Sequence, residues 1–91
     1  MIHHLKINPI PFDLIADGIK TFELRRRDNF KEGDRVRLLE YDLDLKNYTG
    51  RLIEAQITYV LNKSIHGLKE GHCIFCIKVI SVSDPQRFKS S

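Results

Sequence analysis

Residues 18–27, GIKTFELRRR, hold side chains of three chemical kinds at close spacing. Lys20 carries an amine, Glu23 a carboxylate and Arg25 a guanidinium. The group is compatible with a buried ion-pair network that orders the chain. It also suits a cleft in which the two cations bind phosphate and Glu23 orients them. A third arrangement is a catalytic set, with a partly desolvated Lys20 as base and Glu23 as proton carrier. The residue types leave all three open.

A short helix must position Lys20. Asn8 and the prolines that follow it suit a helix entry, because proline has no N–H to lose there and its φ is already fixed. Gly18 is suited to end the helix in a left-handed conformation. The residues expected on the apolar face of this helix are Phe12, Ile15, Ala16 and Ile19, which recur at helical spacing.

A strand over residues 21–27 must position Glu23 and Arg25. Its period of two places Thr21, Glu23 and Arg25 on one face, with Phe22 and Leu24 on the other. Because Lys20 lies between the end of the helix and the start of this strand, we expect its head group to converge with those of Glu23 and Arg25.

Four further strands are predicted, over residues 3–7, 35–42, 51–61 and 73–82. The alternation slips at Leu39, which indicates a bulge. Residues 43–50 read as a polar loop, and Ile53, Ala55, Ile57, Tyr59 and Leu61 are expected to share one face. The apolar run 73–82 is expected to be central and covered on both faces. Five strands in so short a chain tend to curl and close, which predicts a small β-barrel with one helix, in the α+β or mainly-β class.

The composition bounds the function only loosely. The chain of 91 residues is expected to form one domain, with residues 83–91 as a flexible tail. Fifteen Lys and Arg against twelve Asp and Glu give a formal charge of +3, which permits nucleic acid as a partner without demanding it. The chain has no apolar run long enough to span a bilayer and no signal-peptide core near Met1. We therefore expect a cytoplasmic protein with no membrane partner.

Metal and redox chemistry have little support. Cys73 and Cys76 form a single C-x-x-C, whereas structural zinc needs four ligands. Residues three apart on a strand also face opposite sides, so the sulfurs diverge, and small buried side chains are the expected reading. His3 and His4 face opposite sides of their strand, so that one approaches the cleft and the other is packed or solvated. We predict no metal and no cofactor.

The segment GIKTFELR, residues 18–25, matches the G-x-K-x-x-E-x-R signature of the ASCH domains, a branch of the PUA-like superfamily. The "GD" before one predicted strand and "YTGR" before the next extend the resemblance over nearly the whole chain. The sequence is similar to small bacterial and phage proteins that consist of little besides this domain. The resemblance implies a PUA-like five-stranded pseudo-barrel, with one short helix between the first two strands, beside a cleft proposed to bind RNA.

The signature maps onto Lys20, Glu23 and Arg25. Phosphate contacts are expected from the cations around them, and Tyr48 is the best candidate for stacking on a base, whereas Tyr41 and Phe30 are expected to pack in the core or in loops. The predicted nucleic-acid-binding set is Lys6, Lys20, Glu23, Arg25, Arg26, Arg27, Tyr48 and Arg51.

Two other functions stay open. Some relatives remove the acetyl group from 4-acetylcytidine and others are linked to ribonuclease activity. A metal-independent hydrolase of this kind would use Lys20 as base, with Thr21 as nucleophile or water-positioning group, alongside Glu23. A distant glutamate would act as acid, for which Glu40, Glu54 and Glu70 are the candidates. In the third reading, a structural or protein-interaction module, the three charges only order the junction between helix and strand.

Overall fold

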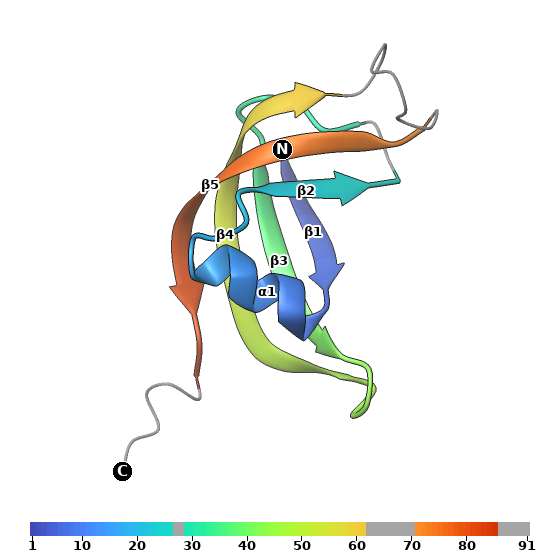
Figure 1. Ribbon diagram of the computed structural model, residues 1–91, viewed down its shortest axis with the longest axis vertical. Coiled ribbons are helices and arrows are strands. Elements are labelled where there is room, and N and C mark those ends of the chain that lie inside the picture. The colour runs from blue at the N-terminus through green and yellow to red at the C-terminus, as the bar shows by residue number, and fades with distance from the viewer. Residues whose placement is uncertain (27–28, 62–70, 86–91) are drawn as a thin grey trace.

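A computed structural model describes residues 1–26, 29–61 and 71–85 of the chain. It is mostly β, with one short helix between the first two strands, as predicted (Figure 1). The elements are β1 (Ile2–Ile7), α1 (Pro9–Ala16), β2 (Phe22–Arg25), β3 (Arg35–Asp42), β4 (Asn47–Leu61) and β5 (Cys73–Ser83). Within these residues, no helix has the length and apolarity that crossing a membrane requires.

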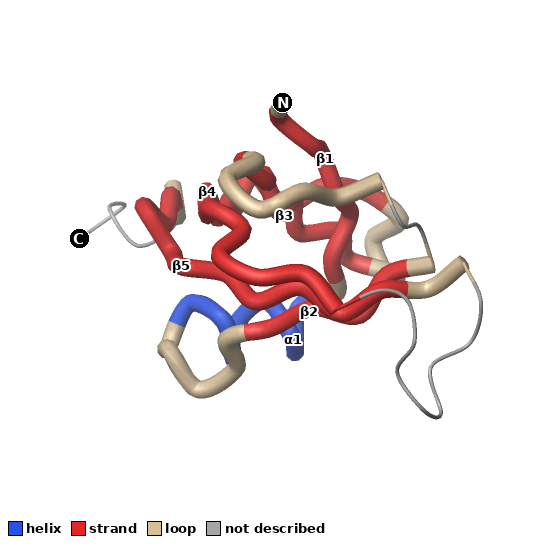
Figure 2. Tube along the Cα trace, turned by 90° about the horizontal axis from the view of Figure 1, so that it is seen from above, coloured by secondary structure: helices blue, strands red, loops and turns tan. Residues whose placement is uncertain are grey.

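The strands form one sheet in the order β1-β3-β4-β5-β2. β1 runs parallel to β3, and the other neighbours are antiparallel. Seen from above, the sheet curls into a half-barrel (Figure 2). The first two strands of the chain are therefore the two edges of the sheet, and a seam separates them where a closed barrel would have a further ladder.

Irregular pairing bends the long strands. The register shifts at Leu39/Tyr41 in the pairing of β3 with β4, which confirms the predicted bulge, and at Glu54/Ala55 and Ile57/Tyr59 in the pairing of β4 with β5. Bulges increase local twist, and both β4 and β5 curve strongly (Figure 1). The last bulge also makes two predicted placements wrong: Tyr59, which is 52% exposed, and Leu61 lie on the face opposite Ile57, and Val60 packs toward the core instead.

The core lies on the concave side of the sheet, where α1 packs across β3 and β5. The helix contributes Phe12 and Ile15, whereas Ile19, beyond the helix end, is exposed rather than part of the apolar stripe. The prediction that β5 is covered on both faces is also wrong, because residues 78–81 are exposed and no element described here covers the convex side. The buried apolar residues are Leu5, Ile7, Phe12, Ile15, Phe30, Val36, Leu38, Ile53, Ala55, Ile57, Cys73, Phe75 and Ile77.

The predicted loop over residues 43–50 is shorter than expected. The carboxylate of Asp42 accepts hydrogen bonds from the backbone N–H groups of Asp44 and Leu45, which closes a tight turn. β4 consequently begins at Asn47, which pairs with Asp42. Tyr48 is therefore a strand residue opposite Tyr41 and not part of a loop.

Candidate functional site: a charged groove at the seam of the sheet

The C-terminal end of α1 fixes the place of Lys20. The N–H of Gly18 bonds to the carbonyl of Ile15, and the N–H groups of Ile19 and Lys20 bond to the carbonyl of Leu14. The first two bonds are those of a Schellman motif, which requires a left-handed residue, and Gly18 has a φ of 77°. The chain thus leaves the helix in one fixed direction, with Lys20 directly before β2.

Strand β2 has its charged face turned inward. Glu23 pairs with Phe75, which pairs with Val60, so the glutamate belongs to a row that faces the core. Phe22 and Leu24 point the other way and are 46% and 53% exposed. The sequence predicted which residues share a face, but not that the apolar pair lies outside.

Three charged head groups meet at Glu23, as predicted. Lys20 Nζ donates to Glu23 Oε1 at 2.7 Å. On the other oxygen, Arg25 Nε donates to Glu23 Oε2 at 3.0 Å, and Arg25 Nη2 lies 2.9 Å from the same atom. Glu23 is 5% exposed, and a buried carboxylate needs such partners to stay charged. We call these three residues the Glu23 cluster.

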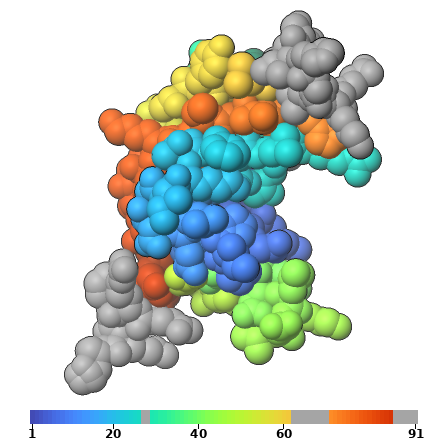
Figure 3. All heavy atoms as spheres, in the orientation of Figure 1, coloured from blue at the N-terminus to red at the C-terminus, as the bar shows by residue number. Residues whose placement is uncertain are grey.

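The Glu23 cluster lines an open groove of about 290 Å³ at the seam between the edge strands β1 and β2. Its charged lining holds three cations and one carboxylate, a formal surplus of +2. In the space-filling view, the outline is indented between the end of β2 (cyan) and the turn joining β3 to β4 (green) (Figure 3). The lining residues are Lys6, Ile7, Asn8, Pro11, Lys20, Phe22, Glu23, Leu24 and Arg25.

Aromatic rings lie beside two of these cations. Lys6 Nζ is 4.2 Å from the centre of the Tyr41 ring and 6.0 Å from that of Tyr48, and the two tyrosines meet edge to face. Lys20 Nζ is 5.4 Å from the centre of the Phe22 ring. Tyr48 and Phe22 are each about half exposed. Phe22 thus lines the groove beside an ammonium group, whereas Tyr41 and Tyr48 lie near Lys6 but are not among the described residues that line the groove.

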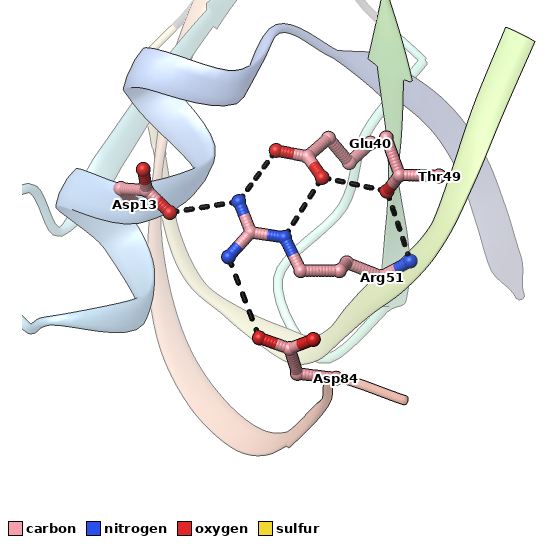
Figure 4. Close-up of polar contacts among 5 residues, drawn as sticks. All are labelled: Asp13, Glu40, Thr49, Arg51 and Asp84. Atoms are coloured by element: carbon pink, nitrogen blue, oxygen red, sulfur yellow. Dashed lines mark hydrogen bonds and ion pairs between the residues drawn. The ribbon is translucent and has the colours of Figure 1, made fainter. Parts of the chain in front are cut away.

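Arg51, predicted to bind nucleic acid, lies in a different cluster (Figure 4). Its Nε and Nη2 donate to the two oxygens of Glu40 at 2.8 and 2.6 Å, and Nη2 also donates to Asp13 at 2.8 Å. Asp84 lies 3.6 Å from Nη1. Thr49 donates its hydroxyl to Glu40 at 2.6 Å. These five residues, the Arg51 cluster, tie α1, β3, β4 and the end of β5 together.

The ion pairs of the Arg51 cluster shift the pKa values of its members. The hydrogen bonds from Arg51 lower the pKa of Glu40, against the opposing effect of burial. The same bonds raise the pKa of Arg51. The guanidinium carbon also stacks 4.4 Å from the centre of the Phe12 ring. Its five residues hold one cation and three carboxylates, and the guanidinium of Arg51 is engaged by all three carboxylates.

The other predicted residues are dispersed. Thr21 is exposed, with its backbone carbonyl bonded to Ile77, and it is not among the described residues that line the groove. Arg26 is exposed, and Arg27 and Glu70 lie outside the described residues. Glu54 accepts a hydrogen bond from Arg37.

The remaining candidates are packing residues or lie away from the groove. His3 is buried, with Nε2 bonded to Asp34 and its ring against Phe30, which confirms Phe30 as a packing residue. Cys73 and Cys76 lie on opposite faces of β5, as predicted, but only Cys73 is buried, whereas Cys76 is half-buried. Across residues 1–26, 29–61 and 71–85, no three His, Cys, Asp or Glu side chains are arranged to hold a metal ion.

Sequence reasoning missed Phe22 as part of the groove, and it missed Asp13 and Asp84 as partners of Arg51. The alternation of side chains along β2 predicts which residues share a face, but it does not predict which face is exposed to solvent. The partners of Arg51 are 38 and 33 residues away along the chain, so no local pattern signals them.

Comparison with known proteins identifies the family. Residues 2–77 match the family described as a domain of unknown function, DUF3850. The chain is also 39% identical, over 64 residues, to an Escherichia phage P2 protein described as "Uncharacterized 12.9 kDa protein in GpA 3'region". That alignment covers 69% of this chain and 57% of the length of the phage protein. The chain belongs to the DUF3850 family.

Proposed function

We propose that the groove at the seam between β1 and β2 binds RNA or a nucleotide through its phosphate groups, in the manner of an ASCH domain of the PUA-like superfamily. The observation that carries this proposal is the Glu23 cluster. A buried carboxylate holds an ammonium and a guanidinium together at the wall of an open groove.

The cations keep donors for a ligand. A lysine ammonium has three N–H donors and an arginine guanidinium five. One donor of Lys20 and two groups of Arg25 face Glu23. The remainder are available to phosphate oxygens, and charge-assisted bonds of this kind are short and strong. Glu23 thus pre-organises the two cations, which reduces the entropy lost when an anion binds.

Three further features support binding. Lys6 adds a third cation from the opposite edge of the groove. The half-exposed ring of Tyr48 lies near Lys6 and offers a face to a base. The curled five-stranded sheet with one helix agrees with the pseudo-barrel that the ASCH resemblance implies.

Binding is favoured over hydrolysis by the position of Thr21. A hydrolase built on Lys20 and Thr21 needs both side chains at one substrate, and Thr21 is exposed outside the residues that line the groove. Incubation with 4-acetylcytidine followed by mass spectrometry tests this choice. We expect no conversion, and turnover that is lost in Lys20→Ala would overturn the preference for binding.

Fluorescence anisotropy with a labelled single-stranded RNA tests the proposal. We expect micromolar or tighter binding at 50 mM salt. The affinity should weaken roughly 15-fold at 200 mM, because binding at about three phosphates releases their counterions. Lys20→Ala is expected to weaken binding several-fold. Its control is Lys78→Ala, which removes an exposed lysine of β5 outside the groove. Absent binding, or equal affinity in both variants, would contradict the proposal.

A further inference from the structure

The outward side of β2 has a composition that folding does not explain. Phe22 pairs with Cys76, which pairs with Tyr59, and all three lie on the convex face of the sheet. Leu24, Ile74 and Leu61 form a parallel row on the same face. Across these two rows the exposed side chains are Phe22, Leu24 and Tyr59, each at about half of full exposure. Strand β2 thus places its carboxylate inside and two large apolar side chains in water. Contiguous exposed apolar side chains are typical of a binding site.

This apolar patch is continuous with the groove. Phe22 and Leu24 belong to the patch and also line the groove, where Lys20 and Arg25 are their neighbours along the strand. Phe22 brings a ring next to the ammonium of Lys20, 5.4 Å from its centre. A ligand that contacts both the Lys20 ammonium and the Phe22 ring must therefore carry a negative charge and a flat apolar surface a few ångströms apart.

A nucleotide of a single strand has this pair of features, a phosphate and an unstacked base. Base-paired RNA hides the faces of its bases, whereas proteins that bind single strands combine a basic groove with aromatic side chains. We infer that Phe22 is a stacking platform for an unpaired base of single-stranded RNA, whose adjacent phosphate binds at Lys20 and Arg25. Leu24 extends the apolar rim beneath the same nucleotide. The inference rests on the proposed RNA binding and specifies its ligand as single-stranded.

A tryptophan reporter tests the inference directly, because the chain contains no tryptophan. Phe22→Trp places the only indole at the proposed platform and preserves an aromatic face. We expect a single-stranded RNA heptamer to quench its fluorescence, and an abasic strand of the same length and charge to leave it unchanged. Tyr59→Trp is the matched control, since it lies in the same row but outside the groove, and its fluorescence should not respond.

Affinity measurements complete the test. Phe22→Leu keeps an apolar side chain in the row and removes the ring, so we expect about tenfold weaker binding to single-stranded RNA with an unchanged salt dependence. Wild-type protein should bind the abasic strand about tenfold more weakly than the natural one, which is a comparison that needs no variant.

The outcomes separate this inference from the proposal beneath it. If wild-type protein binds no RNA, the proposed function fails and the stacking platform with it. If wild-type protein binds, but abasic RNA and Phe22→Leu show unchanged affinities, the stacking inference alone is overturned. Preference for duplex RNA would also overturn it. If Phe22→Leu changes only the sedimentation coefficient of the free protein, the patch is a protein interface and the inference is wrong.

Discussion

Glu23 and Glu40 are two buried glutamates with opposite surroundings. Glu23 is one carboxylate between two cations, and a third cation lines the same groove. Glu40 shares a single guanidinium with two further carboxylates. Both are at most 5% exposed, so burial alone does not distinguish them. The balance of charge among the named residues does: the Glu23 cluster has cationic donors left for an anion, whereas the one cation among the five residues of the Arg51 cluster holds four elements together.

The largest expected effect comes from removing the shared guanidinium. Arg51→Met leaves Glu40 buried without its charge partner, and we expect a loss of about 3–5 kcal/mol in the free energy of unfolding. Urea denaturation measures it. Arg37→Met, which breaks the more exposed pair with Glu54, should cost less than about 1 kcal/mol. Equal losses in the two variants would show that the Arg51 cluster does not stabilise the fold.

The next effect is a pH dependence of the free energy of unfolding that the pair of Glu40 and Arg51 contributes. The folded pKa of Glu40 lies below its ordinary value of 4.5 because Arg51 binds the charged form. Its stabilisation is therefore complete above about pH 4.5 and is lost as the pH falls through the folded pKa. The stability difference between wild type and Glu40→Gln should narrow as the pH is lowered from 6 toward 3. A constant difference would contradict the assignment.

A smaller effect is expected at Glu23. Lys20 and Arg25 retain about a fifth of their side-chain exposure, so water solvates them when the carboxylate is neutralised. We expect Glu23→Gln to lower the free energy of unfolding by about 1–2 kcal/mol, less than Glu40→Gln does. Parallel urea titrations of both variants make the comparison. A larger loss for Glu23→Gln would favour the purely structural reading of this cluster.

The smallest expected effect is that of Arg51 on RNA binding. Because Arg51 lies outside the groove and is engaged by three carboxylates, Arg51→Met should change the RNA affinity less than twofold at temperatures where the variant stays folded. Anisotropy titration beside the wild type measures it. A tenfold loss would return Arg51 to the binding set that the sequence predicted.

Local patterns predicted most of the elements. The helix entry at Pro9, its end at Gly18 and the bulge near Leu39 follow from backbone chemistry that neighbouring residues determine. The meeting of Lys20 with Glu23 was predictable for the same reason, since they are separated by only three residues.

The orientation of Glu23 and the surroundings of Arg51 depend on long-range strand pairing and packing, which local sequence patterns do not predict. The inward orientation of Glu23 follows from the pairing of β2 with β5, some fifty residues later in the chain, and the exposure of Phe22 is its consequence. Arg51 reads as a surface cation from its residue type, and only the packing of α1 and β3 against β4 surrounds it with carboxylates. A charge count along the chain therefore predicts a basic groove, but it does not show that Arg26 and Arg51 lie outside the residues that line it.

The salt dependence of RNA binding tests the central claim most directly, that the Glu23 cluster and Lys6 present cations to phosphate. For three contacts to a single strand, the logarithm of the association constant should fall with the logarithm of salt concentration at a slope of about −2. The variant carrying both Lys20→Ala and Arg25→Ala should reduce that slope to about −0.7. An unchanged slope in the double variant would contradict the account, because the phosphates would then be bound elsewhere on the molecule.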